Sequence, residues 1–189
     1  MKFVVALLIF FALGAGYIVF ERYVTKNKLD AISDHRNTEY VLEGERVQLQ
    51  NGYAETAAAP GSAAKVITRY LGHELESDLD GDGRTDIAFI LTQERGGSGT
   101  FYYAVAARDT GTGYVGSDGF LLGDRIVPQS TEVSSNPRHR NVVVFNYLDR
   151  ASGDPLAAKP TLSKSAYLKL DRVDMRWGIV EANFEGESR

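Results

Sequence analysis

The stretch DLDGDGRTDIAFILTQERGGSGTFYYAVAA, residues 78–107, predicts two consecutive β-strands that are separated by a glycine-rich turn. Its first apolar run, residues 87–92, is rich in Ile and Phe and directly follows an acidic loop. In residues 101–107, after the glycines, aromatic and aliphatic side chains recur at every second position. Short runs of this composition, bounded by Asp-Gly and Gly-Gly pairs, favour strands over helices.

The same period of two appears along most of the chain. Val47 and Leu49 alternate with glutamines, and Asn51-Gly52 is a strong signal for a tight hairpin turn. Further predicted strands are residues 66–71, 141–148 and 166–170, while residues 53–64 and 151–164 are expected to be loops. Turn signals separate these runs, so we predict a mainly β fold, either an antiparallel β-sandwich or a barrel-like domain.

The acidic loop has the spacing of a calcium-binding loop. Carboxylates occupy its positions 1, 3, 5 and 9, and Gly83 at position 6 allows a sharp turn. Oxygen ligands at this spacing can wrap around Ca²⁺. The expected ligands are the side chains of Asp78, Asp80, Asp82 and Asp86 and the backbone carbonyl of Arg84.

This loop is not an EF-hand. Position 12 is Phe89 instead of a bidentate Glu, and the residues that follow read as a strand instead of a helix. It resembles the shorter Asp-x-Asp-x-Asp-Gly-x-x-Asp loops between strands of integrin-like propellers, but one copy does not imply a propeller. The alternative is a solvated acidic turn, since Asp and Gly both form turns. Crowded carboxylates repel one another when no cation lies between them, which favours a structural Ca²⁺.

The N-terminal segment predicts a membrane anchor. Residues 3–20 contain no charged side chain, and eighteen residues at about 1.5 Å each span roughly 27 Å, close to the hydrocarbon thickness of a bilayer. Small residues at 12–16 suit a signal peptidase, whereas residues 17–20 extend the apolar stretch and favour a retained anchor. The predicted organisation is a transmembrane anchor or uncleaved signal at 1–20, a juxtamembrane stalk at 21–42 and an extracytoplasmic β domain at 43–189.

The orientation of this anchor rests on two opposing signals. Lys2 precedes the apolar segment while Arg22, Lys26 and Lys28 follow it, and this distribution favours a cytoplasmic C-terminal side. The short N-terminal tail resembles an export signal, and a weak calcium loop suits a compartment with millimolar calcium. We therefore expect a single-pass protein of the cell membrane, held by residues 3–20, with its C-terminal domain outside the cytoplasm.

Composition limits the other classes of function. The chain has 21 Lys and Arg against 25 Asp and Glu, a net charge of −4, which disfavours nucleic-acid binding because that requires a basic face. It contains no cysteine, so disulfides and lipidation of an N-terminal cysteine are excluded. The three histidines are scattered and form no zinc-ligand pattern such as HExxH.

Two acid-base pairs follow apolar segments in the second half of the chain. Asp124-Arg125 and Asp149-Arg150, with Tyr147 nearby, suggest a small polar pocket for a carboxylate or a sugar-like ligand. The other interpretation, which we favour, is a network of salt bridges that attaches loops to the sheet. A hydrolase would require Asp124 and Asp149 to face each other across a cleft, with the pKa of one raised.

Four motifs together resemble a known group of proteins. They are residues 78–86, Gly-Gly-Ser-Gly-Thr-Phe-Tyr-Tyr at 96–103, Leu-Gly-Asp-Arg-Ile at 122–126 and Asn-Tyr-Leu-Asp-Arg at 146–150. In roughly residues 43–180 the chain resembles a family of uncharacterised bacterial exported or membrane-anchored proteins. The resemblance implies a location outside the cytoplasm and no known activity.

The sequence therefore predicts a membrane-anchored extracytoplasmic binding or envelope-associated module with a structural calcium loop and no defined catalysis. Its protein or envelope ligand is not specified by any motif. The alternative is a carboxylate-dependent hydrolase that acts on an envelope polymer, using the carboxylates near Asp124 and Asp149 as general acid and base.

Overall fold

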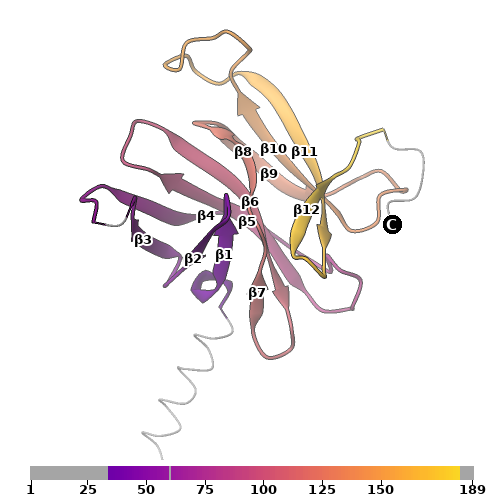
Figure 1. Ribbon diagram of the computed structural model, residues 1–189. Coiled ribbons are helices and arrows are strands. Elements are labelled where there is room, and N and C mark those ends of the chain that lie inside the picture. The colour runs from indigo at the N-terminus through magenta and orange to yellow at the C-terminus, as the bar shows by residue number, and fades with distance from the viewer. Residues whose placement is uncertain (1–33, 60, 184–189) are drawn as a thin grey trace, which may run out of the picture.

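The fold is mainly antiparallel β, as predicted (Figure 1). The computed structural model describes residues 34–59 and 61–183. In these residues one short 3₁₀ helix precedes the strands. The elements are η1 (His35–Asn37), β1 (Glu39–Leu42), β2 (Glu45–Gln48), β3 (Tyr53–Ala57), β4 (Lys65–Ser77), β5 (Asp86–Glu94), β6 (Thr100–Asp109), β7 (Tyr114–Gly116), β8 (Phe120–Asp124), β9 (Val127–Val133), β10 (Val142–Asp149), β11 (Leu162–Asp171) and β12 (Arg176–Ile179).

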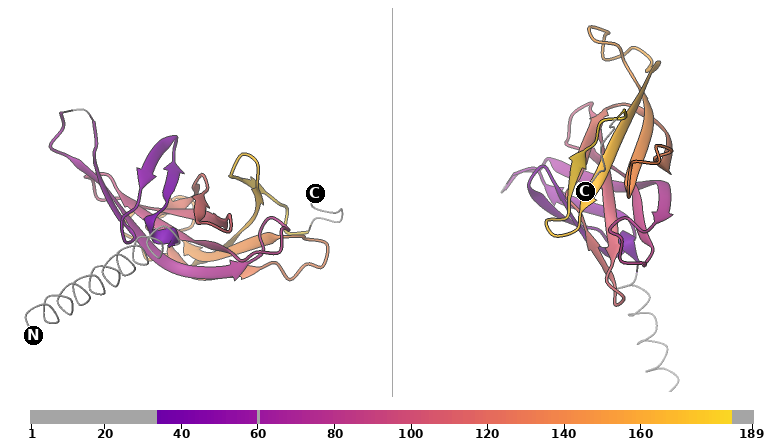
Figure 2. Two further views of the ribbon diagram at one scale, coloured as in Figure 1. Left: turned by 90° about the horizontal axis from the view of Figure 1, so that it is seen from below. Right: turned by 90° about the vertical axis from the view of Figure 1, so that its right-hand side faces the viewer.

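Two larger sheets and one hairpin make up the described part. The first sheet has the order β3-β4-β5-β6-β7, and β8 also pairs with β6. The second has the order β12-β11-β10-β9, and β1 pairs with β2 as a separate hairpin. Figure 2 shows the first sheet as a long curved layer with the β1–β2 hairpin standing on one of its faces.

Strands β5 and β6 lie between two hydrophobic clusters. Phe89, Leu91 and Tyr103 pack with residues of the β1–β2 hairpin in the first cluster. Ile90 and Ala104, on the opposite face, pack with residues of β10 and β11 in the second. This explains why residues 87–91 are continuously apolar, since a strand covered on both faces has no polar side. The arrangement is consistent with the predicted sandwich.

The β1–β2 hairpin is held against the far end of the first sheet. The Val41 N–H donates to the Ser117 carbonyl (3.3 Å), and the Gly119 N–H donates to the Val41 carbonyl (2.7 Å). A Cβ at Gly116 would lie 2.1 Å from the Glu39 carbonyl oxygen, so this close approach requires glycine. The contact holds the two-stranded hairpin on one face of the curved sheet, over the first cluster.

The structure corrects the predicted limits of two segments. Tyr40 and Leu42 are fully buried in the first cluster, so the described end of the predicted stalk, 34–42, belongs to the packed domain. Residues 53–64 are not all loop, because β3 pairs with β4 along its length. Glu55 and the alanines of β3 have low strand propensity, and long-range pairing outweighs it.

Local turn chemistry was predicted correctly at one hairpin. Asn51 and Gly52 both have positive φ, 51° and 78°, as a two-residue turn of type I′ requires. They join β2 to β3. The predicted membrane anchor at 1–20 and residues 21–33 of the stalk lie outside the described residues.

Candidate metal site

The acidic loop connects two paired strands of the first sheet. Asp78 follows the last residue of β4, and Asp86 is the first residue of β5. Ser77 and Asp86 are partners in the β4–β5 ladder, so both ends of the loop are held by backbone pairing. The nonapeptide is thus a strand-to-strand loop, as its flanking sequence predicts.

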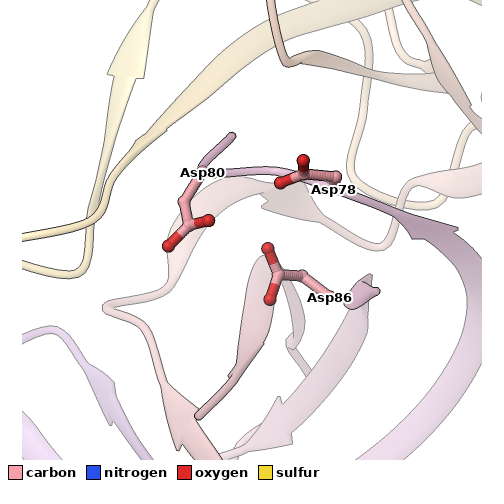
Figure 3. A group of neighbouring side chains, drawn as sticks. All are labelled: Asp78, Asp80 and Asp86. Carbon is pink, nitrogen blue, oxygen red and sulfur yellow. The ribbon is translucent and has the colours of Figure 1, made fainter. Parts of the chain in front are cut away.

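Three carboxylates of the loop converge (Figure 3). One oxygen from each of Asp78, Asp80 and Asp86 can be chosen so that all three atoms lie within 4.8 Å of one another. The Asp80 side chain is 2% exposed and Asp86 is completely buried. Acidic groups so close and so sheltered from water repel one another strongly unless a cation or a proton intervenes.

Backbone donors organise the loop around Asp78. Its Oδ1 accepts the N–H of Gly81 (2.6 Å), and its Oδ2 accepts the N–H of Gly83 (3.0 Å). Burial opposes ionisation of Asp78, but the N–H groups of Gly83, Gly81 and Asp82 outweigh it and lower its pKa. Gly81 and Gly83 adopt φ of +83° and +86°, a left-handed conformation that favours glycine.

Asp86 connects the loop to a neighbouring turn. Its Oδ2 accepts the N–H of Leu79 (3.0 Å), and its Oδ1 accepts the N–H of Asp109 (2.8 Å) at the end of β6. Burial is the main cause of its raised pKa, and the negative charges of Asp80 and Asp82 raise it further. Asp86 therefore has a structural role in addition to its place in the carboxylate cluster.

Asp82 departs from the predicted ligand set. Its carboxylate forms an ion pair with the Arg84 guanidinium, and its Oδ1 accepts the Arg84 N–H (2.8 Å). The Arg84 Nε also donates to the Asp109 carbonyl (3.1 Å). The structure thus brings together three of the four predicted carboxylates, while the fourth is directed to a neighbouring cation.

A basic residue that the sequence pattern did not indicate lies beside the cluster. Arg108 of β6 places its Nη1 3.7 Å from Asp80 Oδ2. It reaches the loop because β5 and β6 pair at Ile87 and Ala107, and sequence spacing contains no signal of this contact. With Arg84 and Arg108 counted against the four aspartates, two negative charges remain in excess at the loop.

The donor set fits a hard divalent cation. Carboxylate oxygens in a loop with a glycine-based turn are ligands that Ca²⁺ accepts, and its flexible coordination tolerates backbone carbonyls and water as additional ligands. The Arg108 guanidinium opposes a cation at Asp80, because two positive charges beside the same carboxylate repel each other.

The second group of candidate residues forms a structural network. Asp124 pairs with the Arg125 guanidinium (2.8 Å) and accepts the Thr100 N–H (2.9 Å). Arg150 donates to the backbone carbonyls of Asp124 (2.6 Å) and Arg125 (3.2 Å). These bonds join the end of β10 to the turn between β8 and β9.

The other two members of this group extend the network. Asp149 pairs with the Lys164 ammonium (2.8 Å), and Tyr147 packs against the second hydrophobic cluster. The pKa of Asp124 is lowered mainly by its bond to Arg125, and that of Asp149 mainly by its bond to Lys164. Both carboxylates are therefore ion-paired with a base, and neither has the raised pKa that a general acid requires.

Comparison with known proteins does not assign the chain to a family. No family model, no curated protein and no solved structure matches it. The resemblance to exported bacterial proteins therefore stays a hypothesis. Within the residues that the structure describes, no helix has the length and apolar character needed to cross a membrane.

Proposed function

We propose that this protein is a membrane-anchored, extracytoplasmic binding module whose β-sandwich domain is stabilised by a structural Ca²⁺ in the 78–86 loop. The observation that carries the proposal is the convergence of carboxylates from Asp78, Asp80 and Asp86 within 4.8 Å. The module has no catalytic role in this proposal.

The position of the loop supports a structural ion instead of a catalytic one. The carboxylates lie where β4 passes into β5, and Asp86 also binds the turn that follows β6. A cation here would tie together a loop and two strands, and so stabilise the folded state by mass action. The uncharged segment at residues 3–20 supports the anchor, and a loop of modest affinity suits a compartment rich in calcium.

The calcium proposal predicts different effects for two neighbouring aspartates. The full chain in detergent should bind Ca²⁺ with a Kd of about 0.1–1 mM, measured by isothermal titration calorimetry. Asp80→Asn removes a carboxylate of the cluster and should weaken binding about tenfold or more. Asp82→Asn removes one that is paired with Arg84 and should weaken it by less than about threefold.

The two variants are matched, because each exchanges one loop carboxylate for its neutral isostere. Equal losses would place Asp82 among the ligands, as the loop spacing predicts. If the wild-type chain releases or absorbs no heat beyond dilution at millimolar calcium, and its stability is unchanged by a chelator, the calcium site is rejected.

The proposed membrane anchor and the outward orientation of the domain predict a second result. The full chain should sediment with membranes and resist extraction by alkaline carbonate, whereas a chain lacking residues 1–20 should be recovered in the soluble fraction. In intact spheroplasts, added protease should digest the domain if it faces outward. Protection until the membrane is permeabilised would contradict the proposed orientation.

A further inference from the structure

Two strand edges face each other at one side of the first sheet. β2 and β3 are joined by the Asn51-Gly52 turn, and Gln50 and Tyr53 exchange backbone hydrogen bonds of 2.8 and 3.1 Å beside it. In the described residues, pairing between the two segments stops there. Beyond this point the strands diverge instead of continuing as a hairpin.

The backbone of β3 directs hydrogen-bonding groups into this gap. The Ala58 N–H donates to the Ala64 carbonyl (2.9 Å), which continues the ladder with β4. Backbone groups alternate in direction along a strand, so the N–H and C=O groups of Thr56 and Ala54 also point toward β4. The alternating residues, Glu55 and Ala57, therefore turn their N–H and C=O groups away from β4 and toward β2. The backbone groups of Tyr53 also point away from β4, because they form the two hydrogen bonds with Gln50.

The facing edge of β2 is arranged in the same way. The Leu49 N–H donates to the Thr38 carbonyl (3.1 Å), which continues the β1–β2 ladder. Leu49 and Val47 therefore face β1, and the alternating residues Gln48 and Arg46 face β3. Two rows of backbone donors and acceptors thus oppose each other, and free strand edges of this kind pair readily with an added chain.

A cleft lies between the first residues of β2 and the end of β3. Its volume is about 530 Å³, and its lining includes Val47 of β2, Val66 of β4 and Gln93 of β5. Residues 57–59, three consecutive alanines, line the β3 side. The small side chains of residues 57–59 leave the backbone accessible at this end of the edge, beyond the charged Glu55.

A polar network fixes the far side of the cleft. Arg95 donates to Glu43 (2.7 Å), to the Tyr103 hydroxyl (2.7 Å) and to Gln93 (2.7 Å), and the Tyr103 hydroxyl donates to Glu43 (2.8 Å). Glu43 lies in the turn of the β1–β2 hairpin with φ of 52°. The turn of the hairpin is therefore attached to Arg95, which follows β5, and to Tyr103 of β6.

The charges of the cleft select among the possible occupants. Its ionisable lining residues are two acids and two bases, Glu43, Glu45, Arg46 and Arg95, whose charges cancel. A neutral lining gives no attraction for a polyanion such as a nucleic acid. A neutral polypeptide complements it, because its backbone can satisfy both rows of donors and acceptors while its side chains alternate between the cleft and solvent.

We propose that an extended, uncharged polypeptide segment of a partner protein binds as an added strand between β2 and β3. Its backbone pairs with Arg46 and Gln48 on one side and with Glu55 and Ala57 on the other. Its inward side chains are apolar and enter the cleft beside Val47 and Val66. This interaction goes beyond the calcium site and does not depend on it.

The test uses the full chain in detergent and a phage-displayed library of random peptides of about ten residues, the length of a long strand. Selection should enrich uncharged sequences with alternating apolar residues. A synthetic peptide of the enriched sequence should slow hydrogen exchange at the amides of Arg46, Gln48, Glu55 and Ala57. Ala57→Pro, which removes one N–H that faces the cleft, should weaken binding about tenfold.

Ala57→Ser is the matched control, because it alters the side chain but keeps both the N–H and the small size that the cleft lining has at this residue, and it should bind nearly as the wild type does. Selection without enrichment over the empty support would overturn the proposal, as would protection confined to other amides or equal binding by the proline variant. Concentration-dependent dimers that protect the same amides would identify a second copy of this chain as the occupant, and would also overturn it. The exchange measurement on the wild type decides the outcome even if the proline variant does not fold.

Discussion

Replacing Asp86 by alanine should lower the free energy of unfolding by about 2–4 kcal/mol even when calcium is absent. Asp86 is completely buried and accepts the N–H groups of Leu79 and Asp109, so its loss leaves two sheltered donors without an acceptor. The substitution also removes a carboxylate whose charged form is disfavoured by burial, and this change by itself favours the folded state. It reduces the loss of stability but does not cancel it, because each buried N–H without an acceptor costs about 1–3 kcal/mol.

Urea denaturation of the full chain in detergent, with excess chelator, measures this effect. Asp80→Ala is the control, because Asp80 belongs to the same cluster and, among the described residues, its carboxylate accepts a backbone N–H from Asp82 within the loop (3.1 Å) and from no other strand. It should cost less than about 1 kcal/mol without calcium and should abolish the stabilisation that calcium confers. Equal effects of the two variants in chelator would contradict the structural role assigned to Asp86.

Replacing Phe89 by alanine should lower the free energy of unfolding by about 3–5 kcal/mol, since a fully buried aromatic side chain leaves a large cavity. Its ring packs edge-on against Tyr40, with centroids 5.5 Å apart, and against His35 at 5.1 Å. Tyr40 belongs to the β1–β2 hairpin, so Phe89 is a contact through which the hairpin is held on the first sheet.

Guanidinium denaturation followed by tryptophan fluorescence measures this second effect, because the single Trp177 lies in the other cluster. Phe89→Leu retains most of the volume and should cost about 1–2 kcal/mol. A cost for Phe89→Ala below that of Phe89→Leu would show that the hairpin does not pack as described. If the unfolding transition reported by Trp177 fluorescence were unchanged in Phe89→Ala, the two hydrophobic clusters would unfold separately.

Several elements could be predicted from local pattern alone. The run at 87–92 and the alternation at 166–170 both lie in strands, β5 and β11. The Asn51-Gly52 turn was predicted because two consecutive residues with positive φ leave few alternatives. Short edge strands such as β12 carry weak sequence patterns, so whether they form depends on the strand with which they pair.

The sequence pattern also predicted three of the carboxylates that converge in the acidic loop, the position of the loop between two strands and the turn at Gly83. Aspartates at the ends of the loop and glycines with positive φ make it close on itself, and this depends on residues that are near in sequence. The pairing of Asp82 with Arg84 was not predicted, although both residues lie inside the motif. Loop spacing indicates which carboxylates can come together, but not which of them pair with a neighbouring arginine instead.

The amino-acid sequence by itself determined the β character, the strand-to-strand position of the loop and the absence of disulfides, because propensity, turn geometry and composition act over a few residues. Tertiary structure alone placed Arg108 beside Asp80, converted Asp124 and Asp149 from candidate catalytic groups into paired ones, and left the β2 and β3 edges facing each other. These features arise when strands distant in the chain pair and pack. Their energies depend on neighbours that no local window of sequence contains.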